Sequence, residues 1–479
     1  MTEGEPMTKP HISAYGDDVL GTLDGTALAE KIKSKEIKPV DAVQAAIQRA
    51  RSVNPMLNAI VTETFDHALE RGGQQLTGPF AGVPTFIKDT DDAENAPTFM
   101  GSLAIPAHLK KRNSSYVKQF LSLGFISLGK TALPEFGLTA TTEPLLSGPT
   151  RNPWNPDYST GGSSGGSAAL VAAGVVPIAH GNDGGGSIRI PASCCGLVGL
   201  KSTRGRLKPM EGTELMPVKI VHQGMLSRTV RDTALFFAGA EQYYKNPKLP
   251  AIGLVEHPGK KRLNIGFFTQ TPFGRPCHPE SLALTHRTAS LCEELGHSVR
   301  EIPCPFEGNL ADDFASYWGM MAFSIRFYGK LMMNPGFDKS RIDPWTLGLS
   351  RLYQKSMLKT PLMIIRLKKA AKKFKTMFET FDIFLCPTLA HPTPEIGYIG
   401  PDVPFDEAFE RVMNYASFTP AQNVSGTPAI SLPMGTDANG MPMGVQFAAG
   451  HGMERQLLEL AFELEEARPW PLIAPGPTA

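Results

Sequence analysis

Two glycine-rich segments carry serines in a pattern that suits nucleophilic catalysis. Residues 161–167 read GGSSGGS and residues 180–192 read HGNDGGGSIRIPA, which places Ser163 and Ser187 twenty-four positions apart. Glycine lets a substrate approach the main chain closely, as a turn that presents N–H groups to a developing oxyanion requires. A flexible Gly/Ser linker has a similar composition, but it would not be flanked by Asp183, Arg189 and Pro191. The pattern therefore favours a serine-based site.

A serine hydroxyl is a weak nucleophile, so this chemistry needs a base. Lys88 follows an apolar run that contains Val83, Phe86 and Ile87, which suits a buried position. Its role as the base is what the family resemblance given below implies. Most lysines lie on the surface. A lysine acts as a base near neutral pH only where burial and neighbouring donors lower its pKa to roughly 7 to 8.

Together these segments resemble the signature of the amidase family, of the bacterial aryl-acylamidase and aminohexanoate-oligomer hydrolase type. The resemblance rests on GGSSGGS, on a DxGGSIRxP block at residues 183–191 and on a Gly-Val-Pro-x-x-x-Lys-Asp segment at residues 82–89. Further similar stretches are residues 129–136, 150–154, 196–201, 423–433 and 440–446. The resemblance spans most of the chain, but residues 205–380 carry little of it.

The resemblance implies a role for each member of a catalytic triad. Ser187 matches the nucleophile, Ser163 the bridging serine that is usually held by a cis peptide, and Lys88 the base. Neutral Lys88 would take the proton of Ser163, which takes that of Ser187, and Ser187 would form an acyl-enzyme that water then hydrolyses. A second serine can relay the proton where a lysine does not reach the nucleophile directly.

The residues around the triad have expected roles as well. An oxyanion hole is predicted from four backbone N–H groups, those of Gly184, Gly185, Gly186 and Ser187. Losing one such donor typically costs about 3 to 4 kcal/mol of transition-state stabilisation. Four side chains are expected to hold the catalytic residues in place without taking part in the reaction: Ser164, Asp183, Arg189 and Asp89. Of these, Asp183 and Arg189 are expected to fix the glycine turn through buried charge-assisted hydrogen bonds.

Two other motif matches predict different chemistry, and we reject both. Residues 161–165 satisfy GxSxG, which would make Ser163 the nucleophile with His391 or His451 as base, but the motif needs a preceding strand. Residues 152–160 contain two prolines and are predicted to be a loop. Residues 124–131 satisfy the phosphate-loop pattern, yet their variable positions are apolar and suit a buried strand, so Lys130 is expected to be structural.

The elements that must position this site follow from the apolar periodicity. Helices are expected over residues 26–53, 114–123, 311–334, 356–376 and 455–467, and strands over 82–87, 125–128, 175–178, 261–267, 383–386, 429–432 and 444–447. This alternation predicts an α/β fold: a single large domain with a central mixed, mostly parallel β-sheet covered by helices on both faces.

Within residues 1–479 we expect one amidase signature domain with four parts. These are a helical N-terminal layer (1–70), the signature core (75–205), a variable part with pocket and lid helices (205–380), and a C-terminal sheet and helix (381–479). The helix over 311–334 is rich in Met and aromatic residues, and the one over 356–376 is rich in lysine. Core packing and a solvated basic face explain them most simply, and an apolar lid is the alternative.

Composition narrows the partners and the compartment. Lys and Arg (47) nearly balance Asp and Glu (46), so no nucleic-acid or membrane partner is expected. The six cysteines form no CxxC pair and no metal-ligand spacing occurs, so we expect reduced thiols, no metal and no cofactor. The polar N-terminal stretch and the lack of a long apolar run predict a soluble, cytoplasmic protein. A homodimer is compatible with the sequence.

The sequence therefore predicts a serine hydrolase that cleaves C–N bonds. Small, aryl or oligomeric amides are the expected substrates, with carbamates (urethanes) and esters as related classes. One alternative is the glutaminase component of a tRNA-dependent amidotransferase, which would need partner proteins and a pocket for a charged amino acid. The other is a catalytically silent binding protein, although all three triad positions are occupied. The specificity is expected to lie in residues 138–150 and 205–380.

Overall fold

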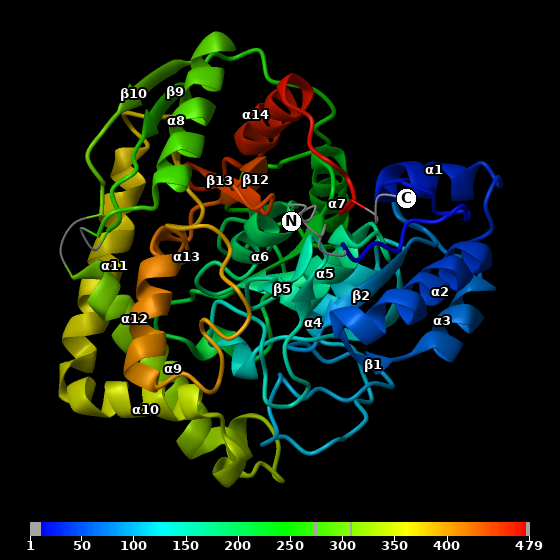
Figure 1. Ribbon diagram of the computed structural model, residues 1–479, viewed down its shortest axis with the longest axis horizontal. Helices are drawn as coiled ribbons and strands as arrows, with labels where there is room; N and C mark the ends of the chain where they lie inside the picture. The colour runs from blue at the N-terminus through cyan, green and yellow to red at the C-terminus, as the bar shows by residue number, and fades with distance from the viewer. Residues whose placement is uncertain (1–10, 273–274, 307–308, 476–479) are drawn as a thin grey trace, which may run out of the picture.

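The computed structural model describes residues 11–272, 275–306 and 309–475. The first ten residues, which belong to the expected N-terminal layer, lie outside these ranges. The layer itself contains α1 (Gly25–Lys33), α2 (Pro39–Leu57), β1 (Ile60–Glu63) and α3 (Phe65–Gly72), drawn in blue in Figure 1. Pro39 begins α2, where its missing N–H is tolerated in the first turn.

A small sheet connects this layer to the rest of the molecule. Its strand order is β1-β3-β2, with β2 at Pro84–Lys88 and β3 at Ile126–Thr131, and α4 (Ser115–Leu121) joins the two. All five residues of β2 are buried. The segment that matches the phosphate-loop pattern forms strand β3, and Lys130 lies inside it, so the structural interpretation of Lys130 is confirmed.

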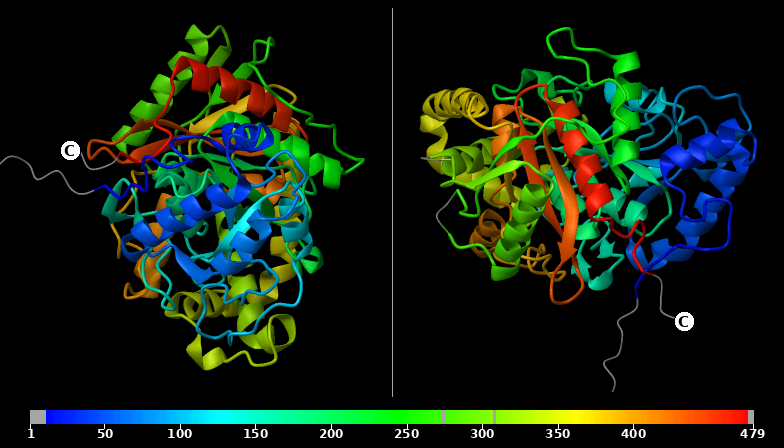
Figure 2. Two further views of the ribbon diagram at one scale, coloured as in Figure 1. Left: turned by 90° about the vertical axis from the view of Figure 1, so that its right-hand side faces the viewer. Right: turned by 90° about the horizontal axis from the view of Figure 1, so that it is seen from above.

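The large sheet is mixed, and its eight strands run in the order β10-β9-β11-β13-β12-β7-β8-β6. Their bounds are β6 (Ile178–Asp183), β7 (Val198–Lys201), β8 (His222–Ser227), β9 (Asn264–Phe267), β10 (Ser298–Glu301), β11 (Ile383–Pro387), β12 (Ala429–Thr436) and β13 (Pro442–Ala449). Strand β6 begins at Ile178, where the predicted run over 175–178 ends. Figure 2 shows how the sheet crosses the molecule.

The expectation that this sheet is mostly parallel is wrong. Only the pairs β10/β9 and β9/β11 are parallel, and the pairs from β11 through β13, β12, β7 and β8 to β6 are antiparallel. Antiparallel neighbours need no helical crossover. The chain between β12 and β13 is a short turn and the chain between β7 and β8 contains no α-helix, so both connections permit antiparallel pairing.

Helices cover both faces of the large sheet, as expected. The helices α7 (Val230–Tyr243), α8 (Pro279–Glu294), α14 (Glu454–Ala467), α5 (Gly165–Ala172) and α6 (Arg189–Cys195) pack against its strands. In Figure 1, α14 lies above β12 and β13, and α5 and α6 lie below them. All residues of α5 and α6 are buried. These two short helices lie deep in the core, and the two glycine-rich segments lead into them.

A group of outer helices lies beside the sheet. It comprises α9 (Leu310–Met332), α10 (Pro344–Ser356), α11 (Thr360–Met377), α12 (Phe405–Tyr415) and α13 (Pro420–Ser425). The two helices expected over 311–334 and 356–376 are present as α9 and α11. Met363 and Leu367 of α11 pack with Tyr317 of α9, while the lysines of α11 are exposed. In the described ranges no helix is both long enough and apolar enough to cross a bilayer.

Residues 152–160 correct a sequence prediction. Their two prolines predict a loop, but β4 (Arg151–Asn152) and β5 (Asn155–Ser159) pair as a short antiparallel hairpin. Asn152 stabilises it by donating a hydrogen bond to the carbonyl of Ser159 at 2.9 Å. A strand therefore does precede the GxSxG match at residues 161–165, so that ground for rejecting the motif was wrong, but the hairpin is separate from the large sheet.

Candidate active site

Lys88 is the last residue of β2, and its side chain is fully buried. Strand β2 lies against β6, the edge strand of the large sheet. The Thr85 hydroxyl donates to the carbonyl of Ile178 at 2.8 Å, and the backbone N–H of Lys88 donates to Nδ1 of His180 at 3.1 Å. The lysine is thus held at the junction of the two sheets.

The Lys88 amino group contacts three neutral oxygen atoms. Its Nζ lies 2.8 Å from Oγ of Ser163, 2.9 Å from Oγ of Ser164 and 2.6 Å from Oδ1 of Asn182. Burial lowers the pKa of Lys88 to about 7, although the charges of Asp183 and Asp91 partly oppose this shift. A lysine with this pKa is largely neutral just above pH 7, which is what a general base requires.

The turn that carries Ser163 depends on glycine. The peptide bond between Gly162 and Ser163 is cis, as the resemblance implied. A Cβ atom on Gly162 would lie 2.6 Å from the carbonyl oxygen of Thr141, and Gly161 has a φ of +68°. Side chains at these two positions would collide with the backbone or strain it. The glycines therefore allow Ser163 to enter the buried space beside Lys88.

Ser187 lies in the turn between β6 and α6, and it borders the same cavity as Ser163. Among the four amides expected to form an oxyanion hole, that of Gly186 already donates to Asp183 Oδ1 at 2.8 Å. Within the described residues, the amides of Gly184, Gly185 and Ser187 have no hydrogen-bond acceptor. Three of the four expected donors are therefore unengaged.

Asp183 and Arg189 form a fully buried ion pair that holds this turn. The Arg189 guanidinium donates to both carboxylate oxygens at 2.8 and 2.9 Å. Burial favours the neutral acid, but Arg189, Lys201 and Asn423 outweigh it and hold the pKa of Asp183 well below its usual range. The remaining Arg189 donors reach three neutral side chains, those of Gln422, Asn423 and Gln446. The pair thus connects the turn to α13 and β13.

Two further residues expected near the triad differ in how close they lie to it. Ser164 contacts Lys88 directly and donates to the backbone carbonyl of Asn182 at 3.3 Å. Asp89 instead accepts from Lys130 at 2.9 Å, and both side chains are completely buried. Asp89 also accepts the N–H of Phe99. Asp89 therefore fixes the loop after β2 rather than the amino group of Lys88.

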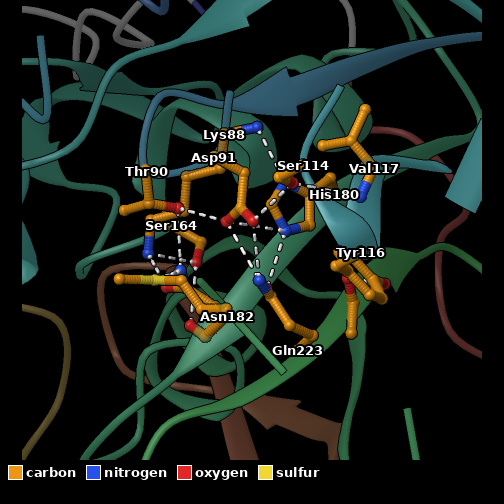
Figure 3. A network of polar contacts seen from close by, with 12 residues as sticks. Lys88, Thr90, Asp91, Ser114, Tyr116, Val117, Ser164, His180, Asn182 and Gln223 are labelled. Carbon is orange, nitrogen blue, oxygen red and sulfur yellow. Dashed lines mark hydrogen bonds and ion pairs between the residues drawn. The ribbon is translucent and has the colours of Figure 1, made fainter. Parts of the chain in front are cut away.

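The structure adds a polar network that sequence reasoning missed. Asp91 accepts hydrogen bonds from the side chains of Thr90, Ser114 and Gln223, at 2.9 to 3.1 Å. Oε1 of Gln223 lies 3.0 Å from Nε2 of His180. Figure 3 shows these side chains converging from the loop after β2, from β6 and β8, and from the start of α4. The residues are far apart in sequence, so no local motif marked them.

His180 is held in one neutral form by this network. Its Nδ1 accepts the Lys88 N–H, so Nε2 carries the proton and donates to Gln223. Burial lowers the pKa of His180 to about 4. The imidazole therefore fixes the backbone of the lysine without adding a positive charge beside it near neutral pH.

The cavity in front of the two serines is mostly apolar. It encloses about 1120 Å³, including the space open to solvent, and none of the described residues that line it is charged. Helix α9 contributes Phe314, Trp318 and Met321, and other walls come from residues 136–140, from Ile220 and Val221, and from residues 412–421. Helix α9 thus packs in the core, as the simpler interpretation expected, and it also borders the cavity, whereas no residue of α11 lines it. The lid alternative stays a prediction.

The side chains that would serve other mechanisms lie in unsuitable surroundings. His391 stacks on Tyr415, and its Nδ1 points at the carbonyl of Pro392. Burial raises the pKa of the Cys194 thiol to about 11 and that of Cys292 to about 12, so neither is a reactive thiolate at neutral pH. These environments support a serine nucleophile.

Comparison with known proteins agrees with this geometry. The amidase family model matches residues 41–458. A putative amidase AmiC of Mycobacterium leprae is 47% identical over 97% of this chain and 99% of its own. A 6-aminohexanoate-cyclic-dimer hydrolase of Paenarthrobacter ureafaciens is 35% identical over 93% of this chain and 95% of its own.

Solved structures extend the comparison to the fold. A structure of a 6-aminohexanoate cyclic dimer hydrolase has a TM-score of 0.87 and 32% identity, and it covers 94% of this chain and 97% of the other. A bacterial aryl acylamidase of the amidase signature family has a TM-score of 0.82 and 26% identity, over 94% and 96% of the two chains. This chain therefore belongs to the amidase signature family and is an amide hydrolase.

Proposed function

We propose that this enzyme hydrolyses neutral, largely apolar amides through an acyl-enzyme on Ser187, with Ser163 as proton relay and Lys88 as base. The observation that carries the proposal is the 2.8 Å contact between Lys88 Nζ and Ser163 Oγ in a fully buried position. The lowered pKa of Lys88, about 7, supplies a neutral amine near physiological pH.

The proton path follows from this contact. Neutral Lys88 accepts the hydroxyl proton of Ser163, and Ser163 accepts that of Ser187 as the Ser187 oxygen attacks the substrate carbonyl. When the tetrahedral intermediate collapses, the C–N bond breaks and the same proton returns through Ser163 to the departing amine. Water then gives a proton to Ser163 as its oxygen adds to the acyl carbon, and the bond from that carbon to Ser187 breaks as the proton returns through Ser163 to the Ser187 oxygen.

The oxyanion that forms in these steps needs donors already in place. We assign this role to the N–H groups of Gly184, Gly185 and Ser187, because the amide of Gly186 is engaged by Asp183. Preorganised donors of this kind stabilise the transition state without further reorganisation.

The cavity supports a substrate class. Its apolar walls suit aryl or aliphatic acyl groups, and carbamates or esters present the same carbonyl to Ser187. The names of two relatives, an aryl acylamidase and a 6-aminohexanoate-cyclic-dimer hydrolase, agree with amide substrates of this kind. Glutamine carries two charged groups, and no charged side chain among the described lining residues would bind them. The geometry therefore gives no support to the glutaminase alternative.

The test combines substrates with matched variants. Chromogenic acyl-anilides, aryl carbamates, esters and glutamine are compared for the wild type, Ser187→Ala and Lys88→Met. Ser122→Ala and Lys118→Met serve as controls, because both residues are exposed and belong to or cap α4. We expect Ser187→Ala and Lys88→Met to lose at least about 10³-fold in kcat. The two controls should match the wild type.

Covalent labelling separates the proposal from its alternatives. A fluorophosphonate should label the wild type and both control variants but not Ser187→Ala. Turnover that persists in Ser187→Ala or Lys88→Met would overturn the assignment of the triad. A folded wild type that neither labels nor turns over any substrate would favour the silent binding protein.

A further inference from the structure

The direction in which the Lys88 amine presents its lone pair is fixed by the donors and acceptors around it. This inference rests on the proposed role of Lys88 as base. A neutral primary amine has two N–H donors and one lone pair, and it is useful as a base only if the lone pair faces the hydroxyl that it must deprotonate. The three neighbours of Nζ are Ser163, Ser164 and Asn182.

Asn182 can only accept a hydrogen bond from Lys88, because Thr90 orients its amide and Asp91 in turn orients the hydroxyl of Thr90. Its Nδ2 donates to the Thr90 hydroxyl at 2.7 Å, and that hydroxyl donates to Oδ2 of Asp91 at 3.1 Å. An ionised carboxylate has no proton to give, so Thr90 must donate to Asp91 and accept from Asn182. The amide oxygen of Asn182 therefore faces Lys88, as the 2.6 Å contact shows.

Asp91 is well suited to fix the donor and acceptor directions in this chain of hydrogen bonds. Its side chain is 1% exposed, and the hydroxyl of Ser114 and the amide of Gln223 also donate to it. Figure 3 shows Thr90 lying between Asp91 and Asn182. A buried carboxylate that receives this many donors acts as an acceptor toward all of them.

Ser164 accepts a hydrogen bond from the second N–H of the Lys88 amine. Its single hydroxyl proton is directed to the backbone carbonyl of Asn182 at 3.3 Å, so its oxygen accepts from Lys88 at 2.9 Å. Of the three neighbours, only Ser163 is left to face the lone pair. When the ammonium form loses a proton, the proton lost is the one that pointed at Ser163.

We propose that Thr90 and Asn182 are positioning residues which, anchored on Asp91, direct the lone pair of Lys88 at Ser163. Neither residue is required to exchange a proton. Without the Thr90 hydroxyl the Nδ2 group of Asn182 keeps only a weaker contact with Sδ of Met210 at 3.7 Å, so the amide can rotate and offer its NH₂ group to Lys88. The lone pair would then face Asn182 instead of the relay serine.

The test uses Thr90→Val, Thr90→Ser and a matched control, Thr285→Val. Thr285 lies in α8, is completely buried and donates its hydroxyl proton to the carbonyl of Ser281 at 2.8 Å, and it is outside the chain from Asp91 to Lys88. We expect Thr90→Val to lower kcat by about 10- to 100-fold with little change in KM. Thr90→Ser should restore most of the rate, and Thr285→Val should keep the wild-type kcat.

A double-mutant cycle tests whether Thr90 acts through Asn182. Asn182→Leu removes the acceptor, so its kcat should fall at least as far as that of Thr90→Val. The double variant should then be no slower than Asn182→Leu alone, whereas independent effects would multiply. Multiplying effects, or a Thr90→Val rate equal to that of Thr285→Val, would overturn the inference.

The outcome for Lys88→Met separates the two proposals. If Lys88→Met is inactive while Thr90→Val behaves like Thr285→Val, only the positioning role is wrong. If Lys88→Met retains turnover, the assignment of the base fails and the positioning role fails with it. Thermal unfolding of each variant shows whether a loss of rate comes from a loss of fold.

Discussion

At the scale of single residues, two equally buried lysines differ because their partners differ. Lys130 lies 2.9 Å from the carboxylate of Asp89, which makes it one half of an ion pair. Lys88 contacts two hydroxyls and an amide oxygen, none of which carries a charge. A buried amine without a counterion loses its proton more easily. Neutral neighbours therefore make Lys88 suitable as a base.

The pH dependence of acylation follows from Lys88. Its pKa is lowered by burial to about 7, and only the neutral form can accept a proton. We expect log kcat/KM for a neutral anilide to rise with pH, to bend near pH 7 and to be flat at higher pH. His180 has a pKa of about 4, so it stays neutral over this range.

Glu135 supplies the control for this profile, since burial raises its pKa to about 7 as well. Its carboxylate accepts from Ser102 and from the backbone of Asp343, and it has no contact with Lys88. Glu135→Gln should keep the bend near pH 7. If the bend disappears in this variant, Glu135 and not Lys88 controls the rate.

At the scale of elements, the turn from β6 to α6 shows what the sequence could and could not predict. The glycines, Ser187 and the flanking Asp183 and Arg189 are contiguous, so their spacing was enough to predict a buried, charge-braced turn. The neutral partners Gln422, Asn423 and Gln446 come from α13 and β13. They are more than two hundred residues away, and only the tertiary fold brings them there.

The ion pair in this turn should be needed for stability. Asp183→Asn leaves the Arg189 guanidinium buried without a counterion, which typically costs about 3 to 5 kcal/mol of unfolding free energy. We expect this loss in urea denaturation, together with loss of fluorophosphonate labelling at Ser187. The exposed pair Lys31–Glu36 gives the comparison, and Glu36→Gln should leave the denaturation midpoint unchanged.

A small effect of Asp183→Asn would contradict this account of the turn. It would mean that the neutral partners alone hold Arg189 and that the carboxylate is dispensable. Retained labelling in a destabilised variant would separate the two functions, because the geometry at Ser187 would then survive without the charge pair.

At the scale of the whole molecule, the layers could be predicted and the strand directions could not. Apolar runs marked most strands, such as β11 and β13, within a few residues. Their pairing depends on which segments meet in space, and β11 lies between a parallel and an antiparallel neighbour. The hairpin at β4 and β5 was missed because its two prolines suggested a loop. The Asp91 network was missed because it joins four separate elements.

The cavity is likewise a product of the whole fold, and its lack of charge predicts selectivity. A charge moved from water into apolar surroundings without a partner costs several kcal/mol. We therefore expect butyryl anilide to exceed its 4-aminobutyryl and succinyl counterparts by at least about 100-fold in kcat/KM. The three acyl groups have similar lengths, so the comparison isolates charge from fit.

Salt dependence shows where this discrimination arises. Because positive and negative residues nearly cancel, with a net charge of +1, the molecule as a whole does not steer charged substrates. A roughly tenfold rise in ionic strength screens surface charges, and it should therefore leave the kcat/KM ratios between the three anilides unchanged. If salt removes the discrimination, it arises from charges at the surface. Equal rates for the three substrates at any salt would mean that the acyl group does not enter this cavity.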